Sequence, residues 1–401
     1  MKKELLLIVG TLLCLCPLHA QKKVYIPEDL RGMNLEADSS KWCWKRSAET
    51  RDCIFMWERG FGNDLQAPPQ LDGKPMAFNI SVLMERVQSF YTFFRDTLGW
   101  IGTAPSKADR YKMMVMVMYS LEGTAYGGTY DNFIGGLWVA PNRIQDKTMN
   151  CMAHELGHSF QSQIMADSIG DCWGGTGFFE MTSQWMLWQV NPWWLRDENY
   201  HFEAFKKLTH KAYLDMENIY HSPYVIQWWS DLHGRKSIAE LFRQGKRGED
   251  PVITYKRMYN LSQQQFNDEM LRGYQHLVNF DFKHARQETR PYACTFTTDL
   301  DTLKGGWLQP KNMPGAYGFN AIPLPTSKKK VRVKLEGKDV HFGFVGVTAD
   351  GETLYGQKDV PVFNCPKDKT LKHLYLVVMG APQEYAPYLQ DTYPYRFRLN
   401  P

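Results

Sequence analysis

The segment His154-Glu155-Leu156-Gly157-His158 constrains this chain more than any other, because its two histidines stand four residues apart. Residues at that spacing lie above one another on one face of an α-helix, so both imidazoles can direct a ring nitrogen at one metal ion. Glu155 stands beside that face, where a carboxylate can reach a metal-bound water without ligating the metal. The spacing predicts a helix that holds one zinc ion through His154 and His158, with Glu155 as general base.

The residues around this segment also favour a helix. Apolar side chains recur at helical spacing on the side opposite the two histidines, at Met149, Met152, Leu156 and Phe160. The alternative is that His154 and His158 are core histidines whose hydrogen bonds are satisfied within the protein. The amphipathic pattern, with Glu155 next to the first histidine, favours the metal site.

A catalytic zinc site usually has a third protein ligand and an open fourth position. A third histidine on the same segment is excluded, because Gln161 and Ile164 occupy the places where it would stand. After a glycine-rich break, residues 178–186 read as a second, apolar helix whose single carboxylate is Glu180. We predict Glu180 as the third ligand. Asp167 and Asp171 are the alternatives, in a stretch typical of a loop.

These residues resemble the gluzincins, which are zinc metallopeptidases with a His, His, Glu site. The chain is more closely similar to a secreted family of uncharacterised metallopeptidases common in gut Bacteroidetes. Six segments carry the similarity: 40–44, 55–62, 136–141, 154–161, 179–180 and 184–186. The resemblance implies that Glu155 takes a proton from the attacking water and then donates it to the leaving amine.

Two departures from the gluzincin pattern affect the interpretation. Thermolysin-like enzymes place an aspartate four residues after the glutamate ligand to orient the first histidine, and this chain has Gln184 there. Gln184, Ser183 or a backbone carbonyl must therefore fix that imidazole. The aminopeptidase signature, a Gly-x-Met-Glu-Asn strand before the zinc helix, does not occur upstream of His154. We therefore favour an endopeptidase.

Two strands are expected before the metal-binding helix. Residues 113–118 form a run of Met and Val typical of a buried strand, and 135–139 read as a strand that begins with two glycines. We predict that the second is an edge strand that pairs with an extended substrate, because an edge strand has unpaired backbone groups. Its predicted contacts are Gly135, Gly136, Leu137 and Trp138. The alternative is a hairpin without a ligand.

A hydrogen-bond donor for the oxyanion of the transition state is expected downstream of Glu180. Tyr220, His221 and Tyr224 are the candidates, in a stretch that reads as helical. The alternative for each of these residues is that it belongs to the core or the surface and has no catalytic role. Several tryptophans also fall near or after the motif; their faces can stack on sugars, and they can equally contribute buried area.

The N-terminal residues predict export. Lys2 and Lys3, an apolar stretch from Leu5 to Leu18, and Ala20 before Gln21 form a signal peptide at residues 1–20, so the protein is expected to be secreted or periplasmic. No later segment is long and apolar enough for a membrane span. The net charge of +4 gives no indication of nucleic-acid binding. Six cysteines remain after cleavage, which suits an oxidising compartment with up to three disulfides. The pairs considered are Cys43 with Cys53, Cys294 with Cys365, and Cys151 with Cys172.

The order of the expected elements predicts an α+β chain with two domains. A short segment, 21–45, precedes a zincin-like domain at 46–285, in which a mixed sheet and the zinc helix are followed by a mostly helical part. Asn79 is expected to cap a helix that extends to about Leu98. Residues 286–401 are predicted to form a β-sandwich, with strands at 330–335, 340–347 and 371–379.

Together these features predict a secreted zinc peptidase that acts on protein or glycoprotein substrates. Two other functions are weighed against it: a glycan- or protein-binding protein on an inert zincin scaffold, and a zinc amidase acting on cell-wall material. The presence of Glu155 argues against the inert scaffold, since such a scaffold has no need of a general base. The sequence does not predict an oligomeric state.

Overall fold

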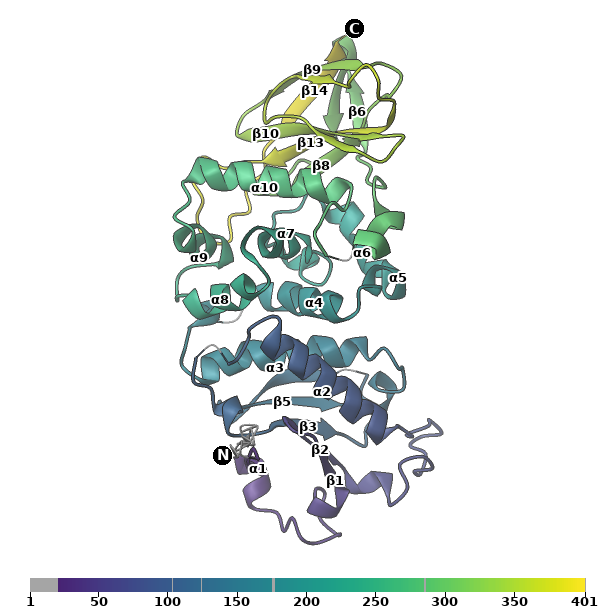
Figure 1. Ribbon diagram of the computed structural model, residues 1–401, viewed down its shortest axis with the longest axis vertical. Coiled ribbons are helices and arrows are strands. Elements are labelled where there is room, and N and C mark those ends of the chain that lie inside the picture. The colour runs from purple at the N-terminus through teal and green to yellow at the C-terminus, as the bar shows by residue number, and fades with distance from the viewer. Residues whose placement is uncertain (1–20, 103, 124, 175–176, 285, 401) are drawn as a thin grey trace, which may run out of the picture.

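The structure is a computed structural model that describes residues 21–102, 104–123, 125–174, 177–284 and 286–400. The predicted signal peptide lies outside these residues. Figure 1 shows an elongated molecule in which a sheet covered by helices lies at one end, a block of helices in the middle, and two further sheets at the other end. The α+β class is confirmed.

The N-terminal sheet has five strands in the order β1-β2-β3-β5-β4. The strand bounds are β1 Ser47–Glu49, β2 Cys53–Trp57, β3 Met113–Val117, β4 Tyr126–Tyr130 and β5 Ile134–Val139. Strands β2, β3 and β5 are parallel to one another, whereas β1 and β4 pair antiparallel at the two edges. The Met and Val run of β3 is fully buried, as expected for an internal strand.

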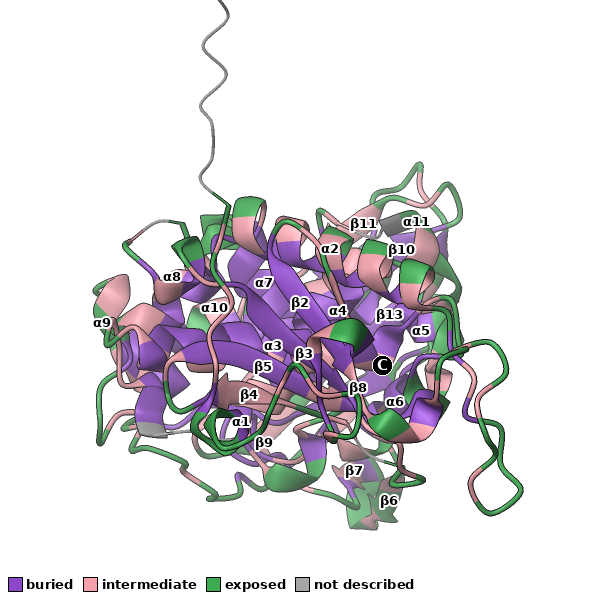
Figure 2. Cartoon of the chain, turned by 90° about the horizontal axis from the view of Figure 1, so that it is seen from below, coloured by how far each residue is buried: buried purple, intermediate pink, exposed green. Residues whose placement is uncertain are grey.

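Two long helices lie against this sheet (Figure 1). Helix α2, Ile80–Asp96, begins where the side chain of Asn79 accepts a hydrogen bond from the backbone N–H of Val82, so the predicted cap is confirmed. Helix α3, Asn150–Ala166, carries the two histidines and packs on β4, β5 and α2. Figure 2 shows that the inner strands β2, β3 and β5 are mostly buried, whereas the edge strand β4 is mostly of intermediate burial.

The middle of the molecule is helical, as predicted. It contains α4 Phe178–Val190, α5 Trp194–Asp197, α6 Asn199–Leu208, α7 Tyr224–His233, α8 Lys236–Gln244, α9 Pro251–Met258 and α10 Gln263–Val278. Most tryptophans of this region are core residues, and Trp193 is the exception, with 42% of its surface exposed. The tryptophans therefore provide no continuous sugar-stacking surface beside the motif.

The C-terminal part contains two antiparallel sheets. One has the order β11-β10-β13-β8, with β8 Phe319–Pro323, β10 Val340–Thr348, β11 Thr353–Tyr355 and β13 Leu371–Gly380. The other has the order β12-β9-β14-β7-β6, with β6 Leu300–Leu303, β7 Trp307–Pro310, β9 Lys330–Gly337, β12 Val362–Asn364 and β14 Tyr395–Asn400. The three strands predicted here are confirmed.

One apolar cluster contains side chains from both C-terminal sheets, including Ile322, Val333, Phe344 and Phe397. The opposite side of the four-stranded sheet packs on α10, and there Val345, Val377 and Met379 join the large core that continues to the N-terminal sheet. The C-terminal part is thus joined to the helical part by a shared core.

Two further predictions concern cysteines and membrane spans. The six described cysteines are free thiols, so none of the three pairings considered from the sequence is formed. None of the described helices has the length and apolar character needed to cross a membrane.

Candidate metal centre

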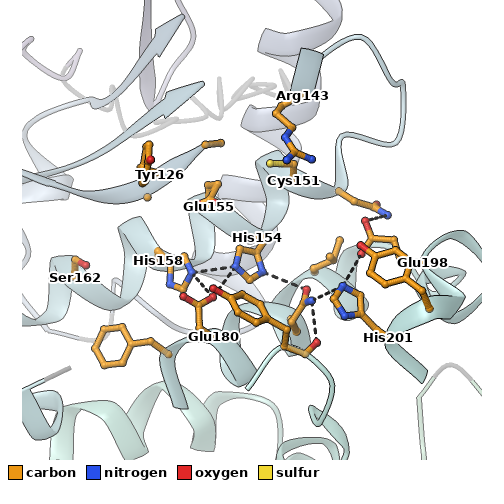
Figure 3. Close-up of a pocket in the computed structure, with 18 residues that line it drawn as sticks. Tyr126, Arg143, Cys151, His154, Glu155, His158, Ser162, Glu180, Glu198 and His201 are labelled. Carbon is orange, nitrogen blue, oxygen red and sulfur yellow. Dashed lines mark hydrogen bonds and ion pairs between the residues drawn. The ribbon is translucent and has the colours of Figure 1, made fainter. Parts of the chain in front are cut away.

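Helices α3 and α4 bring three predicted ligands together (Figure 3). The Nε2 atoms of His154 and His158 are 3.0 Å apart, and they lie 3.0 Å and 3.1 Å from Oε2 of Glu180. These residues are the one group in the described part of the chain whose His, Cys, Asp or Glu side chains could together hold a metal ion. Two imidazole nitrogens and one carboxylate oxygen are a donor set that suits zinc.

The close approach of the two helices depends on Gly157, the glycine between the histidines. A Cβ at this position would lie 2.4 Å from Oγ of Ser183 on α4, so a larger residue would force the helices apart. Ser183 itself donates a hydrogen bond to the backbone carbonyl of His154, at 2.6 Å. Ser183 therefore holds α4 against α3 and does not contact the imidazole ring.

Each candidate histidine ligand has a glutamine behind it. Nδ1 of His154 lies 3.2 Å from Oε1 of Gln184, and Nδ1 of His158 lies 2.9 Å from Oε1 of Gln161. The glutamine amides in turn donate to backbone carbonyls, from Gln184 to Tyr220 and from Gln161 to Phe179. Because amide oxygens only accept, both histidines carry their proton on Nδ1 and present an Nε2 lone pair to the common point.

The hydrogen-bond chain continues beyond Gln184. Its amide nitrogen lies 3.1 Å from Nε2 of His201, and Nδ1 of His201 lies 2.8 Å from Nδ1 of His221. Burial, together with the neighbouring His221 and His154, lowers the pKa of His201 to about 3, so this imidazole is neutral. His221 is thus linked to Gln184, and so to His154, through His201.

The charges of the three candidate ligands are strongly coupled. Burial alone would raise the pKa of Glu180, but the hydrogen bonds and positive charge that His154 and His158 offer in their protonated form outweigh it, and the pKa is lowered. Burial opposes the charge on His158, but the hydrogen bond and charge of Glu180 raise its pKa. The Glu180 carboxylate is therefore ionised, and it attracts positive charge to the point between the two rings.

Glu155 lies in the same pocket, beside the two histidines (Figure 3). Burial raises the pKa of its carboxyl group, against the lowering effect of His154 and His158, and the backbone N–H of Gly127 donates a hydrogen bond to it. A raised pKa makes a carboxylate a stronger base near neutral pH. A carboxylate with this burial can accept a proton from a water in the pocket.

The strand next to Glu155 is β4, which corrects one prediction. Gly135, Gly136, Leu137 and Trp138 belong to β5, which is paired on both sides, with β3 and with β4. They have no free edge, because the glycine-rich strand β4 forms a hairpin with β5 and takes the edge position. Strand β4 also lies very close to α3, since a Cβ at Gly127 would be 1.9 Å from the carbonyl oxygen of Glu155.

The three residues predicted as transition-state stabilisers have different positions. Tyr220 lines the pocket, with its ring stacked on His154 at 6.3 Å between centroids. Burial, followed by the charge and a hydrogen bond of Glu180, raises its pKa. His221 lies behind His201, and Tyr224 is buried among aromatic side chains of the core. The prediction is wrong for Tyr224, because the chain makes a turn at Tyr220 before α7 begins and turns Tyr224 inward.

The alternative carboxylate ligands do not reach the site. Asp167 accepts hydrogen bonds from Ser106 and from Gln163, and Asp171 faces Arg247 at 3.8 Å. Both lie in or near the loop that follows α3, and neither lines the pocket.

The pocket has a volume of about 700 Å³, and aromatic, cationic and acidic side chains line it. Exposed rings of Tyr126, Tyr200 and Tyr220 surround it, and Arg143 and Glu198 lie toward one end (Figure 3). The thiol of Cys151 also lines it, and burial raises its pKa to about 12. A neutral thiol is a weak ligand and nucleophile, so Cys151 forms part of the wall.

Sequence reasoning missed three parts of this site. Strand β4, with the sequence Tyr-Gly-Gly-Thr-Tyr, lacks the apolar pattern of a strand. In the sequence, Gln161 served only to exclude a third histidine ligand at its position. His201 lies on a different helix, α6, far from the motif in sequence. Of these three parts, only Gln161 could have been predicted, because it follows His158 by three residues and therefore lies on the same face of the helix.

The structure is thus that of an α+β protein with a candidate His, His, Glu metal centre between two helices. Residues 16–401 match the model of a family of unknown function, DUF6055, and the chain belongs to that family. A search of curated proteins finds no match.

Proposed function

We propose that this protein is a secreted zinc peptidase, with a zincin-like catalytic domain and a C-terminal β-sandwich accessory domain. The observation that carries the proposal is the convergence of His154, His158 and Glu180 in one pocket with the buried carboxylate of Glu155. A packed core does not require an ionisable glutamate beside such a group, because burying a carboxylate destabilises the fold.

The donor set fits a zinc ion. Both histidines have Nδ1 satisfied by a glutamine oxygen, so their Nε2 lone pairs are free to bind, and Glu180 supplies a negative charge. Since the glutamines are neutral, Glu180 is the one acidic residue of the described chain that is hydrogen-bonded to the two rings. When bound, zinc would lower the pKa of a water molecule and polarise the carbonyl group of the substrate.

The protein residues would supply the remaining steps. Glu155 accepts the proton of the attacking water on its carboxylate and passes it to the nitrogen of the leaving amine. The backbone N–H of Gly127 lies near that carboxylate and stabilises its ionised form. Tyr220 has its hydroxyl against Glu180 and can donate a hydrogen bond to the developing oxyanion.

Strand β4 is suited to align the substrate. It is the edge strand nearest the pocket, and Tyr126 and Gly127 line that pocket. An extended peptide can add to such an edge through backbone hydrogen bonds, which bind main chain of any sequence. This arrangement favours an endopeptidase, and the tyrosines of the rim can pack on the side chains or sugars of a protein or glycoprotein.

The experiment is a comparison of wild type with Glu155→Gln and His154→Ala on casein, mucin glycopeptides and cell-wall fragments. We expect Glu155→Gln to retain metal and lose cleavage, and His154→Ala to lose both. Equal cleavage by wild type and Glu155→Gln would refute the mechanism. Cleavage of cell-wall fragments without cleavage of any protein would instead assign an amidase.

A further inference from the structure

The five-stranded C-terminal sheet has one face toward the core and one toward solvent. Along β9 and β14, four inward side chains are apolar and buried: Val331, Val333, Tyr395 and Phe397. The outward positions at 330–336 of β9 and 396–398 of β14 hold one acidic residue, Glu336, and five cations: Lys330, Arg332, Lys334, Arg396 and Arg398. We call these five cations the basic face. It lies at the end of the molecule opposite the N-terminal sheet (Figure 1).

The pairing of these strands places like charges next to one another. Arg398 stands directly opposite Lys334 in the antiparallel register, an arrangement that destabilises a sheet. Glu336 offsets part of this charge through ion pairs with Lys334 at 2.9 Å and Arg396 at 2.7 Å. Within the described residues, Lys330, Arg332 and Arg398 have no acidic partner. An external anion would remove the repulsion that the fold leaves in place.

A tryptophan ring holds part of the basic face in a fixed arrangement. Lys334, Arg396 and Arg398 all lie over the ring of Trp307, at 5.4, 4.6 and 5.0 Å from its centroid. These side chains leave the ring only 8% exposed. Cation–π contacts of this kind stabilise the charged groups above the ring. A preorganised array loses less side-chain entropy when it binds an anion.

The local sequence extends the charge. Lys328 and Lys329 precede β9, so residues 328–334 read Lys-Lys-Lys-Val-Arg-Val-Lys, with five cations in seven positions. The net charge of the whole chain is only +4. A basic run in a nearly balanced chain creates a local attraction for polyanions.

We propose that the basic face binds an anionic polysaccharide that carries sulfate or carboxylate groups along a single extended chain. The cations of β9 repeat every second residue, about 6.7 Å apart, and the neighbouring strand lies about 4.8 Å away. The array is therefore a narrow stripe that follows the strands. Guanidinium groups bind sulfate-like and carboxylate oxygens through paired hydrogen bonds.

A single-stranded nucleic acid is the competing linear polyanion. Proteins that bind it use exposed aromatic rings on which bases stack. Among the described residues of this sheet, every aromatic side chain is buried: Trp307, Phe363, Tyr395 and Phe397. The basic face thus offers fixed charges without a stacking platform, which suits a charged polysaccharide.

The experiment measures binding of labelled heparin, polygalacturonate, neutral dextran and single-stranded DNA to the mature protein over a range of salt concentrations. The test variant is Arg332→Gln/Lys334→Gln/Arg398→Gln. The matched control, Lys147→Gln/Lys246→Gln/Arg247→Gln, removes the same charge from exposed positions elsewhere. We expect the test variant to bind at least about tenfold more weakly than the control, with a smaller salt dependence, because fewer counterions are displaced.

The two anionic glycans distinguish the ligand groups, since polygalacturonate carries carboxylates alone and heparin also carries sulfates. Equal binding by the test and control variants would overturn the proposal. Binding of DNA as tight as that of both glycans would overturn it as well. Thermal melting checks the fold of each variant, and the single change Arg332→Gln, at a cation without an acidic partner among the described residues, repeats the comparison if the triple variant unfolds.

Discussion

Among the described glycines, Gly127 is the one at which an added Cβ would approach a neighbouring atom most closely, because β4 lies so near α3. In Gly127→Ala, the added Cβ would lie 1.9 Å from the backbone oxygen of Glu155 and 2.8 Å from Cβ of His158. Neither neighbour is the end of a flexible side chain, so the strand must move away from the helix. The N–H of Gly127 then moves away from the Glu155 carboxylate that it holds.

The displaced strand and the weakened contact with Glu155 determine the expected losses of stability and of activity. Forcing a methyl group into a packed region costs about 1–3 kcal/mol of stability. Loss of a hydrogen bond to a charged group costs about 1.5–3 kcal/mol. If that group is the general base, kcat/KM falls by about ten- to a hundredfold. Metal binding should remain, because His154, His158 and Glu180 lie on α3 and α4.

The assay combines urea unfolding, metal content and peptide cleavage for Gly127→Ala and for the matched control Gly128→Ala. At Gly128 the nearest atom to an added Cβ belongs to the Trp138 ring, at 3.9 Å, which is an ordinary contact. We expect Gly128→Ala to resemble wild type in all three measurements. Equal stability and cleavage of the two variants would refute the tight packing of β4 on the helix.

Two further predictions concern the histidine partner and the N-terminal sheet. Gln184→Leu removes the oxygen that faces Nδ1 of His154, so zinc affinity measured by chelator competition should fall about ten- to a hundredfold; unchanged affinity would rule out this orienting role. Asp52 is buried, and although burial raises its pKa, hydrogen bonds and charges from Lys22, Arg51 and Gln88 lower it overall. Its stabilisation is therefore present above the unfolded pKa of about 4 and lost as the pH falls through the lower folded pKa. Asp52→Asn should cost about 3 kcal/mol at pH 7 and much less near pH 2, and an equal cost at both would contradict this.

The elements with strong periodic patterns could be predicted from the sequence. The Asn79 cap, the helix around His154 and the run of Met and Val in β3 each follow from local preferences that the packed structure retains. Glu180 could be chosen because it is the one carboxylate on an apolar helix close behind the histidines. In these cases one local feature determines the position of the side chain.

The neighbours of the site depend on contacts between distant segments. The edge position of β4 follows from the sheet order, and its two glycines weaken the strand pattern that would reveal it. Tyr224 lies only four residues after Tyr220, but a turn separates them and places one in the core and the other in the pocket. The cysteine pairs had plausible spacings, and spacing alone does not bring two thiols together.

The proposed function depends on the binding of one zinc ion by His154, His158 and Glu180. The most direct test is the metal content of the purified mature protein, measured by mass spectrometry for wild type beside Glu180→Ala. We expect about one zinc per chain in wild type and much less in the variant. A folded wild type that binds no zinc when it is supplied would contradict the claim, and zinc retained by Glu180→Ala would contradict the assignment of Glu180.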